Sequence, residues 1–154
     1  MNPAELATYL ARHPVLKALP TEHIALIVSF ATVQQHPAQG RIFVHDQDAD
    51  AFYIVQSGQV AIEVPALGGE PLAIQNVGAD SILGWSWLLP PYRWLFDARA
   101  SVPSTVVAVD GKRLREACEQ DPALGYRILK LFAALMAERL NAARVTAMRH
   151  YSGV

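Results

Sequence analysis

Several features that define common protein classes are rare or absent in this chain of 154 residues. A single cysteine, Cys118, leaves nothing to form an internal disulfide. The 13 Lys and Arg residues nearly balance the 14 Asp and Glu residues, so net charge indicates neither a nucleic-acid-binding surface nor a disordered acidic chain. No apolar run reaches the roughly 20 residues that span a bilayer, and the N-terminus lacks the basic-then-apolar pattern of a signal peptide. We therefore expect a cytoplasmic protein without membrane contact.

Residue patterns typical of catalysis are also missing. Gly68-Gly69 leads into no helix, as a phosphate-binding loop would, and Ser57 precedes a turn, unlike a nucleophile elbow. His36 and His45 lack the spacing of a metal-binding barrel, and we expect both at the surface or in turns. Cys118 has no cation-rich neighbourhood and is expected to be a packed thiol. The sequence thus predicts neither an enzyme nor a metal site.

What the chain does contain is a high apolar content, 52% of its residues, which fits one domain spanning residues 1–154. Residues 1–30 predict helices. Asn2 and Pro3 are typical of a helix start, and His13-Pro14 ends the first helical pattern before a second one follows.

Residues 31–110 form the central part of the chain and have a different pattern. Short runs of valine, isoleucine and aromatic residues alternate with turn residues about every ten positions. No helical segment long enough for a crossover lies between them, so antiparallel strands closing into a barrel are favoured over a parallel sheet. Together with the flanking helices, this predicts an α+β fold: an antiparallel β-roll (jelly-roll-like, a double-stranded β-helix) with N-terminal helices and a long C-terminal helix.

Residues 111–154 return to helical periodicity, with a long helix beginning at Asp121-Pro122. Its first half is apolar over a wide face and should lie on the roll. Its second half is basic, and we expect a solvated face there, formed by Arg139, Arg144, Arg149 and His150. An alternative is a helix pair across a dimer axis or with another protein, because small residues let helices approach closely. The residues predicted for this contact are Met136, Leu140, Ala143, Ala147 and Met148.

The stretch 84–100 holds all three tryptophans of the protein, Trp85, Trp87 and Trp94, beside Pro90-Pro91. This much aromatic area left in water would cost several kcal/mol at roughly 25 cal/mol per Å². A core, a ligand or a partner must therefore cover it. Two interpretations are open: an aromatic plug in the domain's own core, or the lining of a ligand pocket.

Residues 39–60 carry a recognisable pattern. A glycine precedes Ile42-Phe43, acidic residues form a turn, and Phe52-Tyr53-Ile54-Val55 leads to a second turn at Gly58. Gly58 suits a tight hairpin, and aspartate at position 46 tolerates the left-handed backbone of a turn. This pattern, with the order of helices and strands over the whole chain, resembles the cyclic nucleotide-binding domain of catabolite-activator-like (Crp/Fnr-type) regulators. The resemblance implies a regulatory or sensor domain.

In that family a phosphate-binding cassette starts at a glycine–glutamate pair; the glutamate contacts the ribose hydroxyl, and an arginine further along contacts the cyclic phosphate. Gly84 matches the glycine, whereas Trp85 and Trp94 stand in place of the glutamate and the arginine. An indole has one N–H donor and no charge, so it cannot neutralise a phosphate. Ordinary binding of cAMP or cGMP is therefore not expected, and no other cofactor is predicted.

Two neighbouring arginines are alternatives for the phosphate contact. Arg93 is one position from Trp94, and Arg99 precedes a run of small residues like the one that follows the family's arginine. Asp97 is expected to form a local ion pair with Arg93 or Arg99. The full set of predicted ligand-binding residues is Gly84, Trp85, Ser86, Trp87, Arg93, Trp94, Asp97 and Arg99.

The sequence thus favours a non-enzymatic sensor module that takes a flat or apolar small molecule or is filled by its own indoles. Cyclic nucleotide binding through Arg93 or Arg99, and a protein-interaction subunit acting through the long helix as a homodimer or with a protein partner, are the alternatives. The family's transcription factors continue into a helix-turn-helix domain, and residues 151–154 are too few to form one. We therefore expect a stand-alone domain without sequence-specific DNA binding.

Overall fold

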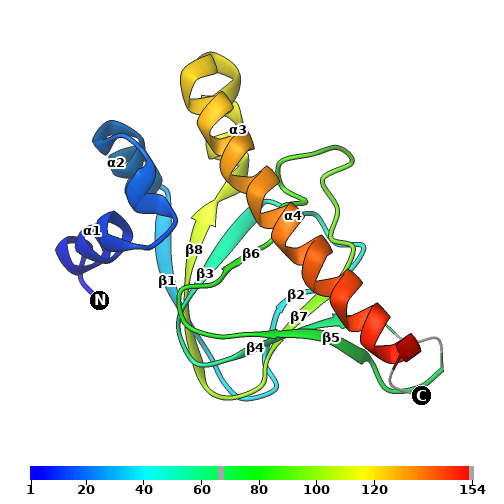
Figure 1. Ribbon diagram of the computed structural model, residues 1–154. Coiled ribbons are helices and arrows are strands. Elements are labelled where there is room, and N and C mark those ends of the chain that lie inside the picture. The colour runs from blue at the N-terminus through cyan, green and yellow to red at the C-terminus, as the bar shows by residue number, and fades with distance from the viewer. Residues whose placement is uncertain (66–67, 153–154) are drawn as a thin grey trace.

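The computed structural model describes residues 1–65 and 68–152, and side chains as far as residue 149. The predicted contribution of His150 to a basic face lies outside the described side chains. Helices stand at both ends of the chain and strands lie between them, so the predicted fold class is confirmed (Figure 1). The elements in chain order are α1 (Pro3–Arg12), the 3-10 helix η1 (Leu16–Ala18), α2 (Thr21–Ser29), β1 (Ala31–His36), β2 (Arg41–Phe43), β3 (Ala51–Ser57), β4 (Val60–Val64), β5 (Leu72–Val77), β6 (Ile82–Leu83), β7 (Asp97–Ala100), β8 (Ser104–Asp110), α3 (Gly111–Gln120) and α4 (Pro122–Ser152).

The strands of the described residues form two antiparallel four-stranded sheets, in the orders β1-β8-β3-β6 and β2-β7-β4-β5. Most neighbouring strands are distant in sequence. Residues Ala31 to His36 of β1 pair with Val109 to Ser104 of β8, for example, and β4 pairs with β7 as well as with β5. The two sheets form the predicted roll, and α1 and α2 lie together on one side of it, whereas α4 crosses to the β5 end (Figure 1).

Alternation along the strands fills the interior of the roll. Phe52 and Ile54 of β3 belong to one buried cluster, as their two-residue spacing predicts, and Ile62 of β4 packs into the same cluster. The turns also follow the sequence. Asp46 adopts a left-handed backbone with φ 64°, as expected, and Gly58 has φ 101°. A Cβ atom on Gly58 would lie 2.1 Å from the Ser104 hydroxyl oxygen, so both backbone conformation and space require glycine there.

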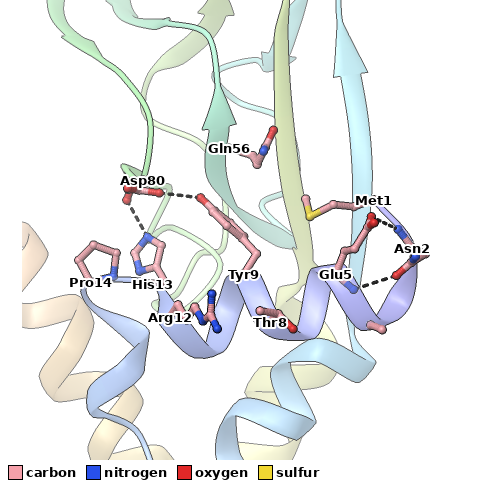
Figure 2. Close-up of a pocket in the computed structure, with 11 residues that line it drawn as sticks. Met1, Asn2, Glu5, Thr8, Tyr9, Arg12, His13, Pro14, Gln56 and Asp80 are labelled. Carbon is pink, nitrogen blue, oxygen red and sulfur yellow. Dashed lines mark hydrogen bonds between the residues drawn. The ribbon is translucent and has the colours of Figure 1, made fainter.

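Helix α1 is held at both ends. At its start, the Asn2 side chain accepts the Glu5 amide at 2.8 Å and the Glu5 carboxylate accepts the Asn2 amide at 2.9 Å, a complete capping box. At its end, the buried His13 ring donates from Nε2 to the Asp80 carbonyl at 2.7 Å and accepts the Val15 amide at Nδ1. Tyr9 donates to the Asp80 carboxylate at 2.9 Å, so two side chains of α1 bind the turn before β6 (Figure 2).

Helix α4 packs on the domain through its first half, as predicted. Asp121 accepts the amides of Ala123 and Leu124, which starts the helix. Leu124, Ile128 and Phe132 are buried in the core cluster.

Candidate functional site

The cassette predicted at 84–100 consists of a long connection after β6, residues 84–96, and the strand β7; the connection is bound to the turn between β2 and β3. The Trp94 amide donates to the Gln47 carbonyl at 3.0 Å, and the Trp94 carbonyl accepts the Asp46 amide at 2.9 Å. The Ala49 amide donates to the Tyr92 carbonyl at 2.8 Å. These backbone hydrogen bonds fix the direction in which the side chain of Trp94 points.

The Trp94 ring is packed between an aromatic ring and a glycine. It stacks on Phe43 with ring centroids 3.9 Å apart and an interplanar angle of 13°. Only 5% of Trp94 is exposed. Gly84 faces the edge of the same ring: its φ is 91°, and a Cβ atom added to it would lie 2.6 Å from a ring carbon of Trp94. Gly84 therefore provides the space that the indole occupies.

The cavity left beside this stack measures about 30 Å³. Four predicted ligand-binding residues meet there: Gly84, Trp85, Ser86 and Trp94. The remaining described residues around it are Phe43, Ile62, Leu95, Phe96 and Arg139. A single water occupies roughly this share of liquid volume, about 30 Å³.

Trp87 lies apart from the other two tryptophans. Its ring is fully buried against Phe52 and Phe132, with centroids 5.5 and 5.3 Å away. A Cβ atom on Gly111 would lie 3.0 Å from it, and its indole N–H has no hydrogen-bond partner among the described residues. The structure thus places Trp87 in the core under α3 and α4, and its prediction as a residue lining the same pocket as Trp85 and Trp94 is corrected.

Arg93 points away from this small cavity. Its Nη1 donates to the Asp48 carboxylate at 3.0 Å, and its Nη2 donates to the Asp46 carbonyl, so the guanidinium contacts the turn between β2 and β3. The Arg93 side chain is half-exposed there.

Arg99 lies on the outer face of the sheet. It forms a two-pronged ion pair with the buried Glu63 carboxylate, with N–O distances of 3.0 and 2.7 Å. This hydrogen bonding lowers the pKa of Glu63 and raises the pKa of Arg99. Its neighbours Ala98 and Ala100 are fully buried, consistent with strand alternation that leaves Arg99 outside.

Asp97 is also on the outer face, and its predicted ion pair with Arg93 or Arg99 is wrong. The buried carboxylate accepts the backbone amide and ring Nδ1 of His45, both at 2.8 Å, and Arg41 lies 3.6 Å away. Burial by itself would raise the pKa of Asp97, but the hydrogen bonds from His45 and the charges of His45 and Arg41 outweigh it, so the pKa lies below its ordinary value. His45 lies in a turn, as predicted, and its ring is bound to Asp97.

Arg139 is the residue that the sequence interpretation missed. Instead of lying on a solvated face, it is half-buried beneath α4, where Nη2 donates to the Ile82 carbonyl at 2.7 Å and Cζ lies 6.0 Å from the Trp85 ring centroid. Burial lowers the pKa of Arg139. The spacing could have revealed this position, because Arg139 follows Phe132 by seven residues and Met136 by three, on one helix face.

A wider groove lies next to the small cavity, between α4 and the strands β4 and β5. Its volume is about 270 Å³. Most of the described residues that line it are apolar: Ile62, Ile74, Gln75, Trp85, Phe96, Met136, Arg139, Leu140, Ala142, Ala143 and Thr146. Arg139 is the only charged side chain among them. Trp85 and Arg139 border both this groove and the small cavity, so the two spaces share a wall.

The residues predicted for helix pairing follow α4 outward from this groove. Met136 is half-buried and lines it, as do Leu140 and Ala143. Leu140 is 72% exposed and Met148 is 59% exposed, and Ala147 is exposed as well. Pairing through these residues stays a prediction.

Other features of the described chain offer less chemistry. A hollow of about 690 Å³ beside α1 is open to solvent, and polar groups around it, such as Tyr9 and Asp80, already bind one another (Figure 2). Residues 1–65 and 68–152 contain no cluster of three or more His, Cys, Asp or Glu side chains suited to a metal. Cys118 is half-buried, and burial raises its pKa to about 11. In that same part of the chain, no helix is long and apolar enough to cross a membrane.

Known proteins resemble this chain in sequence and in structure. Glutaminase 1 of Bradyrhizobium diazoefficiens is 26% identical over 133 residues, which make up 86% of this chain and 21% of that protein, so the chain spans about a fifth of this curated relative. The crystal structure of a cyclic nucleotide-binding protein from Geobacter metallireducens GS-15 is 27% identical, with a TM-score of 0.77 over 91% of this chain and 98% of the other. The catabolite activator protein of Thermus thermophilus is 24% identical, with a TM-score of 0.67 over 87% of this chain and 61% of the other.

The family model of the cyclic nucleotide-binding domain matches residues 33–121, more than half of the chain. The matched residues run from β1 to the end of α3 and include the whole cassette. The fold of this family supports a regulatory or sensor module. The chain therefore belongs to the cyclic nucleotide-binding domain family.

Proposed function

We propose that this chain is a non-enzymatic regulatory or sensor module whose nucleotide cavity is filled by its own tryptophans, so that it does not bind cAMP or cGMP in the usual manner of the family. The observation that carries the proposal is the position of Trp94, stacked on Phe43 and pressed against Gly84. With this ring in place, the remaining cavity of about 30 Å³ is too small for a nucleotide.

Charge supports the same conclusion. A buried cyclic phosphate needs a fixed cation or several aimed N–H groups, because an unpaired charge is expensive to bury. Trp94 and Trp85 replace the arginine and the glutamate that the family uses. Arg139 is the only charged residue among the described residues around the small cavity, and it comes from α4, outside the cassette in which the family places its anchors.

Binding through Arg93 or Arg99 would require each arginine to leave its present partner. Arg93 would have to give up Asp48. Arg99 would have to leave Glu63, which is buried and would then be an unpaired charge. Arg99 would also have to turn from the outer face of the sheet to the inner one, which a regular strand does not permit.

The comparison with glutaminase supports a regulatory role. The chain is similar to about a fifth of a protein whose name is that of an enzyme, which fits an accessory module rather than a catalytic domain. We propose no glutaminase activity for this chain.

A second candidate function is assembly through α4, as a homodimer or with another protein. The observation that favours it is the exposure of large apolar side chains on this helix, Leu140 at 72% and Met148 at 59%. Changing Leu140 to a charged residue should reduce any self-association measured by sedimentation velocity, whereas a monomeric wild type would remove the homodimer form of this candidate.

The proposed function is tested by titrating the purified protein with cAMP and cGMP, followed by tryptophan fluorescence and calorimetry. All three tryptophans lie in the cassette, so a ligand there would change their emission. We expect no saturable response at millimolar nucleotide. Micromolar binding, about 8 kcal/mol, that is lost in Arg93→Ala or Arg99→Ala would overturn the proposal.

A further inference from the structure

The groove between α4 and the strands β4 and β5 holds a cation in apolar surroundings. Arg139 reaches it from α4, and the Trp85 and Phe96 side chains line it from the cassette. No ion pair joins Arg139 to any described carboxylate, unlike Arg93 and Arg99. Its hydrogen bond to the Ile82 carbonyl uses one of the five N–H groups of a guanidinium, and the neighbouring Glu138 attracts its charge without forming a direct ion pair.

We propose that this groove binds a small amphipathic carboxylate with a planar apolar body, and that Arg139 holds its carboxylate group. The inference deepens the proposed sensor function and rests on it, because it gives that sensor a ligand class other than a cyclic nucleotide.

The anionic group of the ligand follows from the state of Arg139. Burial of a guanidinium without a directly bound carboxylate is unfavourable, and it lowers the pKa of Arg139 although the nearby charge of Glu138 acts in the opposite direction. A planar fork of N–H donors matches a carboxylate with two parallel hydrogen bonds. One guanidinium balances one negative charge, and because no second cation lines the groove in the described chain, a doubly charged phosphate is disfavoured.

The apolar body follows from the walls. Ile74 and Leu140 are large apolar residues left 44% and 72% exposed on the two sides of the groove. The rings of Trp85 and Phe96 favour a flat body, since planar groups stack on aromatic faces. A volume of about 270 Å³ is near the lower end of small-ligand sites, roughly 300–1,000 Å³. It suits an acid of one or two rings.

The experiment uses 2-naphthoate as the probe and 2-naphthamide, its uncharged counterpart of nearly the same shape, as the control ligand. Binding to the full chain is followed by calorimetry and by ligand-observed NMR. The test variant is Arg139→Gln, which removes the charge and keeps a polar side chain that can donate a hydrogen bond. The matched control is Arg144→Gln, which removes an exposed arginine of the same helix outside the groove.

We expect the wild type and Arg144→Gln to bind 2-naphthoate equally, and Arg139→Gln to bind it about tenfold or more weakly, as for the loss of a charge-assisted hydrogen bond. The wild type should prefer the acid over the amide by a similar factor. Ala143→Phe, a change at an exposed position of the groove wall, should also block binding and keeps the test valid if Arg139→Gln does not fold.

The inference is overturned if 2-naphthoate does not bind at millimolar concentration, if the amide binds as well as the acid, or if Arg139→Gln retains wild-type affinity. Its failure is separable from that of the proposed function. Saturable cAMP or cGMP binding that depends on Arg93 or Arg99 refutes the proposed function whatever the naphthoate result. If neither 2-naphthoate nor a cyclic nucleotide binds, only the inference is refuted.

Discussion

Replacing Trp94 by alanine tests directly whether the indole is the structural filling of the nucleotide cavity. The side chain is 95% buried by contact with Phe43, Gly84 and the cassette, since only 5% of it is exposed. Truncation of a buried aromatic residue to alanine typically costs about 3–5 kcal/mol. We expect Trp94→Ala to fall within that range, because removing the ring abolishes its stacking on Phe43, at 3.9 Å between centroids, and also leaves a cavity.

The assay is urea and thermal unfolding of Trp94→Ala followed by far-UV circular dichroism. For a domain of this size, about 2–4 °C of melting temperature corresponds to 1 kcal/mol, so we expect a decrease of roughly 6–20 °C. The neighbouring Leu95→Ala serves as the control, because Leu95 is 67% exposed and surface changes usually stay within about 0.5 kcal/mol.

Free indole provides a second readout of the same variant. An apolar cavity made by truncation can bind a molecule of the deleted shape, and a ligand of the native state raises the melting temperature by mass action. Millimolar indole should therefore partly restore Trp94→Ala and leave the wild type unchanged. A stability loss below about 1 kcal/mol, far under the range for buried aromatics, would refute the reasoning, because Trp94 could then leave the cavity at little cost and admit a nucleotide.

Three further predictions concern backbone, capping and pH. Gly84→Ala should lower the free energy of unfolding more than Gly68→Ala. Both glycines have positive φ, but only at Gly84 would the added Cβ atom meet a ring carbon of Trp94, at 2.6 Å. Urea unfolding of the two variants checks this, and equal losses would contradict it. Asn2→Ala should cost about 1 kcal/mol through loss of the capping box, measured in the same way, with no change expected if α1 were held only by Tyr9 and His13. The pKa of Asp97 is lower in the folded state than its ordinary value of 3.8, so Asp97 stabilises the fold above pH 3.8 and this contribution is lost as the pH falls through the folded-state pKa. Asp97→Asn should therefore weaken the dependence of the free energy of unfolding on pH in the acid range. An unchanged dependence would contradict this.

The fold could be predicted because its signals are local. Asp46 was expected to tolerate a left-handed turn and has φ 64°, and the helix starts at Asn2 and Asp121 follow from capping chemistry within a few residues of each cap. Strand alternation and turn spacing then leave few ways to arrange antiparallel strands between terminal helices.

The partners of Asp97 and Arg99 could not be predicted, because they depend on pairing between distant strands. The register of β7 places Asp97 opposite Glu63 of β4, and Arg99 opposite both Ala61 and Arg41. Charges from β2, β4 and β7 thus meet on one outer face, and Asp97 turns to Arg41 and His45 while Arg99 turns to Glu63. Nearness in sequence suggested a different pairing.

The directions in which the tryptophan side chains point could not be predicted from the sequence either. Residues between β6 and β7 have no regular periodicity, so sequence spacing does not reveal which side chains point the same way. The structure sends Trp87 under α4 against Phe132, and sends Trp94 across to Phe43. Trp87 and Trp94 both belong to the buried core cluster, whereas the half-buried Trp85 lines the groove beside it.

The two candidate functions are coupled because they use the same side chains. Leu140 and Ala143 line the groove beside Arg139 and also belong to the predicted pairing face of α4. A carboxylate held by Arg139 would cover part of Leu140, so a partner helix would meet a different surface with and without the ligand. By linkage, a ligand that changes this surface changes partner affinity by the same factor by which the partner changes ligand affinity. The cation proposed to bind the ligand, Arg139, thus lies on α4 and not in the cassette. Ligand binding would change the surface that α4 offers to a partner without any movement of the tryptophan-filled cavity.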